Sequence, residues 1–251
     1  MPVLPEHDRL HVVMVRTRNP LNIGAAARAM SNFGFERLRV VTPYAPSFRE
    51  ARSAVGASSV LVNAEEFQSV AEAVADCGLV VGTTAAAHRE LHHPLRYLAD
   101  GRELIHKELR AGHVALLFGS EKVGLSNEDL SHCHWLMRIP TREEHSSMNL
   151  GQAVAVCLYE LARGFCNDKR ANACPPGEQP LASAGELERI TALLLDTLRA
   201  SGYLKPSSKA DGEAKIRRLV RRLHLPADDA ELWLGIFRQI AWKTQSNLES
   251  E

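Results

Sequence analysis

Short apolar runs separated by longer amphipathic stretches dominate the first 165 residues of the chain. Runs of this kind are typical of strands that are buried on both faces of a parallel sheet. We expect strands at Leu10–Val15, Leu38–Val41, Leu79–Val81, Val114–Phe118 and Leu136–Ile139. The stretches between and after them predict helices at Leu21–Phe33, Phe67–Asp76, Leu95–Arg110 and Leu150–Phe165. Strands that alternate with helices predict an α/β fold with a mainly parallel sheet.

The pattern changes after residue 165. Residues 166–183 are rich in Asn and Pro and include Pro175-Pro176-Gly177, a composition that continues neither a helix nor a strand. Beyond this predicted linker, helical periodicity returns at Glu186–Ser201, Ala210–Leu223 and Ala227–Trp242. The sequence therefore predicts an α/β domain over residues 1–165 and a small all-helical domain over residues 184–251.

Composition places few limits on function. The chain has 251 residues, 45% of them hydrophobic, which is enough for a core of ordinary size. Lys+Arg and Asp+Glu number 30 each, so net charge does not indicate a nucleic-acid partner. Arg residues are nevertheless concentrated in the first sixty positions. We therefore expect any RNA-binding surface to be a local basic patch.

Neither a membrane span nor a metal site is indicated. No apolar run reaches membrane-spanning length, and the first residues lack a basic segment followed by an apolar one. The five Cys lie mostly in apolar surroundings, so we expect reduced thiols and a cytoplasmic protein. His132-Cys133-His134 has no second ligand pair at zinc-site spacing. We interpret it as a strand with polar alternation.

Gly and polar residues directly follow several predicted strands. In a parallel sheet these positions meet at one edge, where ligands bind. They are Arg16–Gly24, Gly82–Ala85, Gly119–Gly124 and Ser146–Leu150. Gly at such positions lets a ligand approach the backbone closely. We expect a ligand-binding site at this edge.

The residues of these loops do not match the motifs of three common ligand-binding sites. A dinucleotide site requires G-x-G-x-x-G, but the first of these loops contains only Gly24. A P-loop requires Lys and Ser or Thr after its second Gly, whereas Gly119–Gly124 is followed by Leu125-Ser126. The nucleophile elbow of hydrolases, G-x-S-x-G, does not match the sequence around Ser120. The site therefore belongs to another class.

Three motifs in order along the chain carry a resemblance to a known family. They are Asn22-Ile-Gly-Ala-Ala-Ala-Arg28, then Leu117-Phe-Gly-Ser-Glu-Lys-Val-Gly-Leu125, and then Ile139-Pro140 with Ser147-Met-Asn-Leu150. With these motifs the chain resembles the SpoU-type, TrmH-like RNA 2′-O-methyltransferases of the SPOUT superfamily. The C-terminal region, with Ser201-Gly-Tyr-Leu204, is similar to the TrmJ branch. The resemblance covers nearly the whole chain.

The resemblance implies a fold and a cofactor that the pattern alone does not indicate. It implies a SPOUT-type parallel sheet whose C-terminal part forms a trefoil knot, and a homodimer with active sites at the subunit interface. The implied cofactor is S-adenosylmethionine. Its implied binding residues are Thr83, Thr84, Ala85, Gly119, Ile139, Ser147, Met148 and Leu150.

The resemblance also implies catalytic residues. Arg28 matches the family's catalytic arginine, and a guanidinium is a poor base. Arg28 either acts with a substrate phosphate to orient the hydroxyl or accept its proton, or lies on the helix surface and makes a phosphate contact only. Asn22 either caps its helix or orients Arg28. Glu121 pairs with Arg28 or Asn22, or is an exposed loop acid. Ser147 either bonds substrate or cofactor or caps the last helix of the α/β domain, and the same two roles are open for Asn149.

The expected reaction is methylation of a tRNA ribose, at cytidine or uridine 32 of the anticodon loop. Lys215, Arg217, Arg218, Arg221 and Arg222 put five bases within eight residues of one helix. Candidate RNA contacts are Arg16, Arg18, Arg89, Lys215, Arg218 and Arg222. Two alternatives are an rRNA ribose methyltransferase of the same superfamily and a non-catalytic RNA-binding relative.

Overall fold

A computed structural model describes residues 5–53, 59–85, 92–167, 180–204 and 209–248. The strands are β1 (Leu10–Val15), β2 (Arg37–Val41), β3 (Glu65–Phe67), β4 (Cys77–Thr83), β5 (Leu95–Tyr97), β6 (His113–Phe118) and β7 (Trp135–Arg138). The α-helices are α1 (Pro20–Phe33), α2 (Ala45–Ser53), α3 (Ser59–Val62), α4 (Val70–Ala73), α5 (Leu98–Ala111), α6 (Asn127–Ser131), α7 (Leu150–Asn167), α8 (Ala184–Ala200), α9 (Lys209–Arg222) and α10 (Ala227–Leu248). Two short 3-10 helices cover Pro5–Arg9 and Glu143–His145.

The described strands form one sheet in the order β3-β2-β1-β6-β4-β7-β5, and every pair is parallel. The five strands predicted from sequence are confirmed with small shifts at their ends. The sequence analysis missed β3 and β5, which are the two edge strands of the sheet. Both are three residues long, and β5 is exposed along its whole length.

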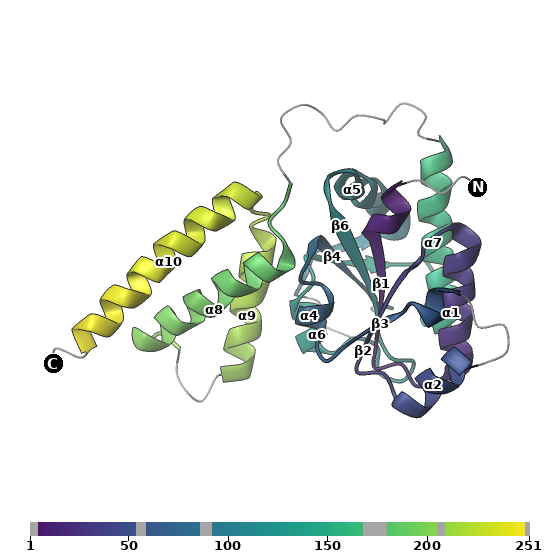
Figure 1. The fold of residues 1–251 in the computed structure, drawn as a ribbon, viewed down its shortest axis with the longest axis horizontal. Helices are drawn as coiled ribbons and strands as arrows, with labels where there is room; N and C mark the ends of the chain where they lie inside the picture. Colours follow the sequence, from purple (N-terminus) through teal and green to yellow (C-terminus); the bar gives the residue numbers. More distant parts are fainter. Residues whose placement is uncertain (1–4, 54–58, 86–91, 168–179, 205–208, 249–251) are drawn as a thin grey trace.

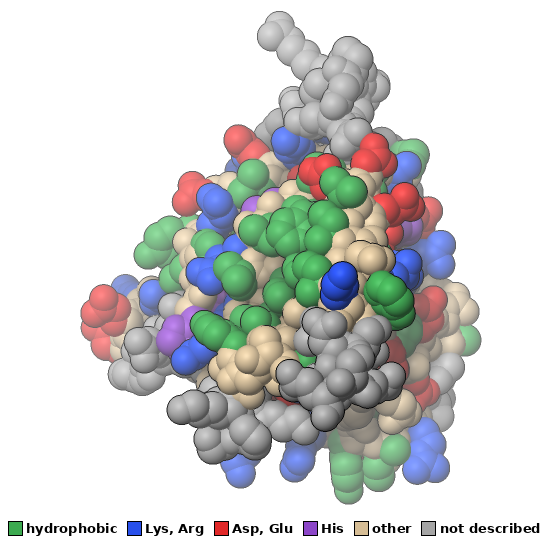
Figure 2. Space-filling view, turned by 90° about the vertical axis from the view of Figure 1, so that its left-hand side faces the viewer, with side chains coloured by type: hydrophobic (Ala, Val, Ile, Leu, Met, Phe, Trp, Pro, Cys, Tyr) green, Lys and Arg blue, Asp and Glu red, His purple; other side chains and the backbone are tan. Residues whose placement is uncertain are grey.

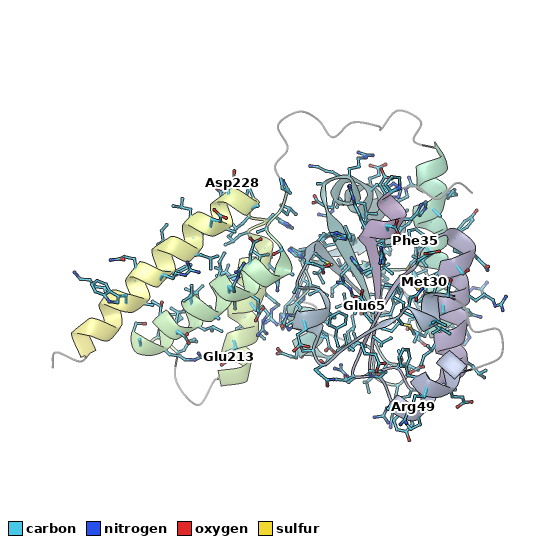
Figure 3. All side chains as sticks on the ribbon, viewed as in Figure 1. Met30, Phe35, Arg49, Glu65, Glu213 and Asp228 are labelled. Carbon is cyan, nitrogen blue, oxygen red and sulfur yellow. The ribbon has the colours of Figure 1, made fainter. Side chains whose placement is uncertain are left out.

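The sheet is covered by helices on both faces (Figure 1). Leu10, Val12 and Met14 of β1 pack in the core that includes α1, α5 and α7. Val13 and Val15 of the same strand pack in a second core with α4 and α6. Adjacent strand residues therefore enter opposite cores, as the pleat requires. Figure 3 labels two residues of the first core, Met30 of α1 and Phe35, on the side of the sheet where α1 lies.

Two predicted helices are wrong in extent. In place of a helix over Phe67–Asp76, the chain forms β3 and then the single turn α4. Ser69 caps this turn by accepting a hydrogen bond from the amide of Glu72, and β4 begins at Cys77. The predicted helix Leu95–Arg110 joined β5 and α5 into one element. β5 is extended because it pairs with β7, and the helix begins only at Leu98.

His132-Cys133-His134 does not lie on a strand, contrary to our interpretation. These residues connect α6 to β7. The amide of Val80 donates to Nδ1 of His134 at 3.0 Å, and the amide of His134 donates to the carbonyl of Val80 at 2.8 Å. His134 therefore serves to fix the connection against β4. Cys77, Cys133 and Cys157 are free and buried.

The C-terminal helices, which we call the helical region (residues 180–204 and 209–248), have a core of their own. It contains Leu187, Ile190, Val220, Leu234 and Phe237. Helix α7 runs to Asn167, two residues into the predicted linker, and residues 168–179 of that linker lie outside the described residues. None of the described helices has the length and apolar character of a membrane span.

The outer side of α10 is not packed against the α/β part of the chain. Figure 2 looks onto the helical region and shows hydrophobic side chains gathered at the centre of this face. Exposed apolar residues of α10 are Leu232, Trp233, Ile236, Ile240 and Trp242. Helix α10 therefore contributes only its Leu234 and Phe237 side to the core.

Candidate active site

A pocket of about 770 Å³ lies at the carboxyl ends of the central strands. Its wall comes from the residues that follow β4, β6 and β7 and from the starts of α1 and α7. All eight residues expected to bind the cofactor line it: Thr83, Thr84, Ala85, Gly119, Ile139, Ser147, Met148 and Leu150. Segments that are far apart in the sequence thus meet at the edge of the sheet where the strand order predicts a ligand.

The loop after β6 forms one wall of the pocket. The amide of Gly124 donates to the carbonyl of Ser120 at 2.9 Å, which closes the loop on itself. Gly124 has a φ of +67°, a left-handed conformation that favours glycine. A Cβ on Gly119 would lie only 2.1 Å from a backbone carbon of Gly124. The two glycines are therefore required by the loop's own geometry.

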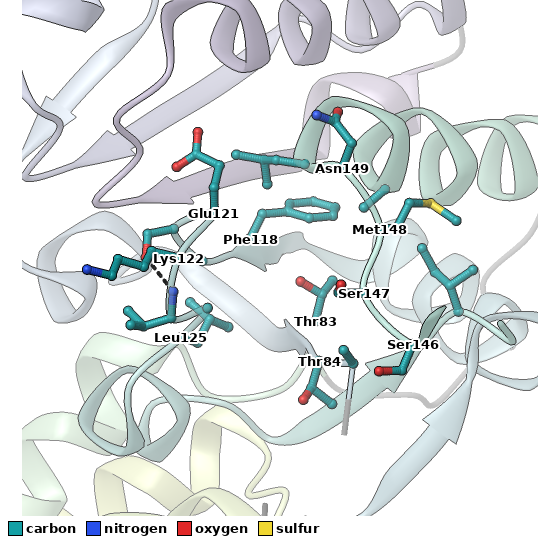
Figure 4. A pocket seen from close by; sticks show the side chains of 18 of the residues that line it. Thr83, Thr84, Phe118, Glu121, Lys122, Leu125, Ser146, Ser147, Met148 and Asn149 are labelled. Carbon is teal, nitrogen blue, oxygen red and sulfur yellow. Dashed lines mark hydrogen bonds between the residues drawn. The ribbon is translucent and has the colours of Figure 1, made fainter. Parts of the chain in front are cut away.

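The opposite wall comes from the ends of β4 and β7 and the segment before α7 (Figure 4). The hydroxyl of Thr83 donates to the carbonyl of Leu117 at 2.8 Å, and the amide of Thr84 donates to the carbonyl of Met137 at 3.0 Å. These bonds fix β4 against both of its neighbours. Figure 4 shows Leu125 and Lys122 on one side of the pocket and Met148 and Ser146 on the other.

Three side chains from three motifs form a hydrogen-bonded set at the rim of the pocket. Nδ2 of Asn22 donates to Oε1 of Glu121 at 3.0 Å. Nδ2 of Asn149 donates to Oδ1 of Asn22 at 2.8 Å. Glu121 also accepts from the backbone amides of Arg18 at 3.3 Å and Asn19 at 3.2 Å. Because a carboxylate only accepts, this chain of bonds fixes which way each amide points.

Glu121 carries the negative charge of this set. Partial burial tends to raise its pKa, but the hydrogen bonds from Asn22 and the backbone amides outweigh burial and hold the pKa below its ordinary value. The carboxyl group is therefore ionised at neutral pH. Of the two pairings considered from sequence, Glu121 makes the one with Asn22 and not the one with Arg28.

The residue that caps helix α7 differs from one that we expected from sequence. Helix α7 begins at Leu150, so Ser147 is not its cap. Asn149 has this position, and its Oδ1 accepts from the amide of Gln152 at 3.3 Å. Asn149 thus both caps α7 and bonds Asn22. No described residue hydrogen-bonds the hydroxyl of Ser147, which lines the pocket.

Arg28 does not line the pocket. It lies on α1 six residues after Asn22, and six helical residues advance about 9 Å and turn the side chain by about 120° relative to Asn22. Asn22 is buried toward the pocket, whereas Arg28 is exposed. The role of Asn22 as the cap of α1 is also wrong, because Asn19 caps this helix. Asn22 is bonded to Glu121 and Asn149 instead.

The candidate RNA-binding residues differ in their surroundings. Arg16 bonds Asp129 through both terminal nitrogens, whereas Arg18 is exposed. Lys215 and Arg222 are exposed on α9, and Arg218 is partly buried. Arg89 lies outside the described residues. The other two bases of the run in α9, Arg217 and Arg221, both bond Glu188 of α8.

Several lining residues were not anticipated from sequence. Apolar ones include Phe118, Leu125 and Met137. Phe118 is the last residue of β6, so the predicted end of that strand carried a signal for it. Asp129, which does not line the pocket but bonds Arg16, was not anticipated either. Ser126-x-x-Asp129 matches the capping-box pattern, and the structure has this capping box at the start of α6.

A pocket with apolar and polar lining residues and a charged carboxylate at its rim, at the carboxyl edge of an all-parallel sheet, is typical of an α/β protein that binds a small ligand. The model of the SpoU rRNA methylase family matches residues 9–159. The chain belongs to this family.

Full-length relatives agree with this assignment. The tRNA (cytidine/uridine-2'-O-)-methyltransferase TrmJ of Pectobacterium atrosepticum is 33% identical over 234 residues, 93% of this chain and 97% of the relative. The protein of the same name from Klebsiella pneumoniae is 35% identical over 239 residues, 93% of this chain and 96% of the relative. The crystal structure of TrmJ from Z. mobilis ZM4 matches with a TM-score of 0.78 at 32% identity, over 92% of this chain and 98% of that chain.

Proposed function

We propose that the chain methylates a ribose 2′-hydroxyl of tRNA, with S-adenosylmethionine as the methyl donor. The hydrogen-bonded set of Asn22, Glu121 and Asn149 at the pocket rim carries this proposal, because it joins all three motifs at one place. The relatives named tRNA methyltransferases, which match the chain nearly end to end, favour tRNA. An rRNA substrate and a non-catalytic RNA-binding role are the alternatives.

The pocket fits the proposed cofactor. Its volume is in the range of sites for ligands of this size. Phe118, Leu125, Met137 and Ile139 offer an apolar slot for an adenine ring. Gly119 and Thr84 line the same pocket. When bound, S-adenosylmethionine supplies an electrophilic methyl group.

The residues at the rim have distinct tasks toward the ribose. The 2′-hydroxyl is a very weak acid and must lose its proton as its oxygen attacks. Glu121 holds Asn22 rigidly, so that Asn22 and Asn149 present fixed polar groups to the substrate. The hydroxyl of Ser147 is available for a bond to substrate or cofactor. Arg28 contacts a substrate phosphate and assists removal of the proton.

Arg28 fulfils this role from a second subunit. It is exposed on α1, outside the pocket of its own chain. Large apolar side chains on α1 and on α7, which packs against it, are also exposed: Leu21 is 79% exposed on α1, and Tyr159 is 54% exposed on α7. A homodimer that covers α1 and α7 buries these residues and brings Arg28 to the partner's pocket. The trefoil knot of this fold belongs to the same proposal.

The helical region binds the tRNA. Lys215, Arg218 and Arg222 on α9 and Arg18 beside the pocket are suited to phosphate contacts. Arg89 belongs to this set on the resemblance alone. We assign the target to cytidine or uridine 32 of the anticodon loop, in the cytoplasm.

Transfer of a radiolabelled methyl group onto tRNA and rRNA tests the proposal. We expect label in tRNA only. Glu121→Gln should reduce the rate at least about tenfold, since it loses the charge that holds Asn22 and the backbone amides. Glu144→Gln, an exposed acid of the neighbouring pocket loop, is the matched control and should be as active as the wild type. Label in rRNA supports an rRNA substrate. Cofactor binding without any methyl transfer supports a non-catalytic RNA-binding role.

A further inference from the structure

Helix α6 carries two adjacent acids, one bonded to the helical region and the other to the loop after β1. Oε1 of Glu128 accepts from a terminal nitrogen of Arg217 on α9 at 2.9 Å. The carboxylate of Asp129 accepts from both terminal nitrogens of Arg16, the first residue after β1. The short helix α6 is therefore held between the helical region and the loop that precedes α1.

Arg217 has little freedom to leave this position. Its Nε donates to both carboxylate oxygens of Glu188 at 3.1 and 3.2 Å. The nitrogen that bonds Glu128 also donates to the hydroxyl of Ser131 at 2.9 Å. The Arg217 side chain is only 12% exposed. A planar guanidinium that bonds three partners at once holds them in a defined geometry.

Asp129, the second acid of α6, is also held in place. The Asp129 side chain is 5% exposed, and it accepts from the amide and hydroxyl of Ser126 as well as from Arg16. Burial tends to raise the pKa of Asp129, but these hydrogen bonds outweigh it and hold the pKa below its usual value. Arg16 has a φ of +52°, and its amide donates to the carbonyl of Val41 at 2.9 Å. Asp129 therefore anchors the start of the loop after β1.

This loop leads directly to Glu121. The amides of Arg18 and Asn19, two and three residues after Arg16, are the backbone donors to the Glu121 carboxylate. A contiguous polar path thus runs from Arg217 through α6 and Arg16 to the rim of the pocket. The same helix α9 exposes Lys215 and Arg222, the residues to which the proposed function assigns tRNA contacts.

We propose that Arg217 is a positioning residue that couples the docking of α9 to the geometry of Glu121. The helical region then both binds RNA and holds the rim in its active arrangement. This inference rests on the proposed function for its catalytic consequence, but the coupling itself exists in the free protein. Networks of this kind typically change a coupled equilibrium by a few-fold to about thirtyfold.

Amide hydrogen exchange at single residues tests the coupling without any substrate. Arg217→Met keeps the length of the side chain and removes its donors. We expect exchange at Arg18 and Asn19 to become about tenfold faster in this variant. Arg199→Met is the matched control, because Arg199 bonds only Asp196 and Glu213 within the helical region among the described residues. Unchanged exchange in Arg217→Met, or an equal change in the control, would overturn the proposal.

Glu128→Gln is a second variant that tests the same coupling if Arg217→Met fails to fold. It weakens the bond to α6 and leaves the pairing of Arg217 with Glu188 intact. We expect faster exchange at the same two amides. If they exchange as in the wild type while Arg217→Met is unfolded, the proposal is wrong.

Kinetics then test the catalytic consequence. We expect Arg217→Met to lower kcat on tRNA about tenfold and to change the KM for S-adenosylmethionine less than about twofold. Because Arg217 acts through Glu121, the double variant with Glu121→Gln should be no slower than Glu121→Gln alone. If the double variant loses the product of the two single losses in kcat, Arg217 does not act through Glu121. Absence of methyl transfer by the wild type on any RNA contradicts the proposed function instead, and leaves the exchange result to decide the coupling.

Discussion

Acidification from pH 7.5 to pH 5 should strongly destabilise the fold, because several histidines are buried in the neutral form. Burial, together with the nearby positive charge of Arg39, lowers the pKa of His11 to about 3. Burial, together with Arg218, lowers the pKa of His93 to about 4. His134 is fully buried, and burial lowers its pKa in the same direction. Each of these rings resists protonation in the folded chain.

The sign and size of the effect follow from the protons bound by each state. In the unfolded chain the rings of His11 and His93 take up a proton as the pH falls through 6.5, whereas in the folded chain they stay neutral to about pH 4. The unfolded state binds more protons, so stability is lost as the pH falls through this window. At about 1.4 kcal/mol per pH unit, a fall to pH 5 costs about 2 kcal/mol for the buried His11 and less for His93, which is only partly buried and better screened by solvent.

Urea unfolding followed by circular dichroism at the two pH values measures this loss. His11→Leu removes one titrating ring and its 3.0 Å contact with His113. We expect this variant to be less stable at pH 7.5 but to lose about 2 kcal/mol less than the wild type on acidification. His145→Leu changes an exposed histidine and should behave as the wild type. A wild-type loss below about 1 kcal/mol, or a full loss in His11→Leu, would refute the reasoning.

Three further predictions concern the site. Arg28→Ala should lower kcat at least about 100-fold, with the Kd of S-adenosylmethionine changed less than about twofold; a large loss of cofactor affinity in calorimetry would contradict its role. Gly119→Ala should abolish cofactor binding, because its Cβ meets the backbone at 2.1 Å, while Gly112→Ala, with open space, should bind normally. Lys215→Ala combined with Arg222→Ala should raise the Kd for tRNA about tenfold and flatten its salt dependence, and unchanged affinity would remove α9 from the RNA surface.

The strands and the pocket were accessible from sequence because their signals are local. Five buried strands appeared as apolar runs, and the Gly and polar residues that follow them marked the edge where the pocket lies. The edge strands β3 and β5 were missed because they are short and mostly exposed, so they carry no apolar run. They are strands because β3 pairs with β2 and β5 pairs with β7. These partners are distant in sequence, so a local pattern of residues does not reveal the pairing.

The relations between side chains were less accessible. The three motifs indicated Asn22, Glu121 and Asn149 separately, but only the fold joins them into one hydrogen-bonded set. The shared motif raised the possibility that Asn22 orients Arg28, whereas the helical turn carries Arg28 to an exposed side of α1. The run of bases in α9 gave no sign that Glu188, on another helix, engages two of them.

Methyl transfer to a tRNA that carries a single 2′-deoxynucleotide tests the central claim most directly. The substrate is a tRNA transcript with either cytidine or 2′-deoxycytidine at position 32 and is otherwise unchanged. The account predicts that the ribose form accepts one methyl group per molecule at this nucleotide, whereas the deoxy form binds equally well and accepts none. Equal methylation of both forms would contradict the assignment of the methyl group to this 2′-hydroxyl. An absence of methylation in the ribose form, with S-adenosylmethionine and tRNA both bound, would contradict the catalytic claim itself.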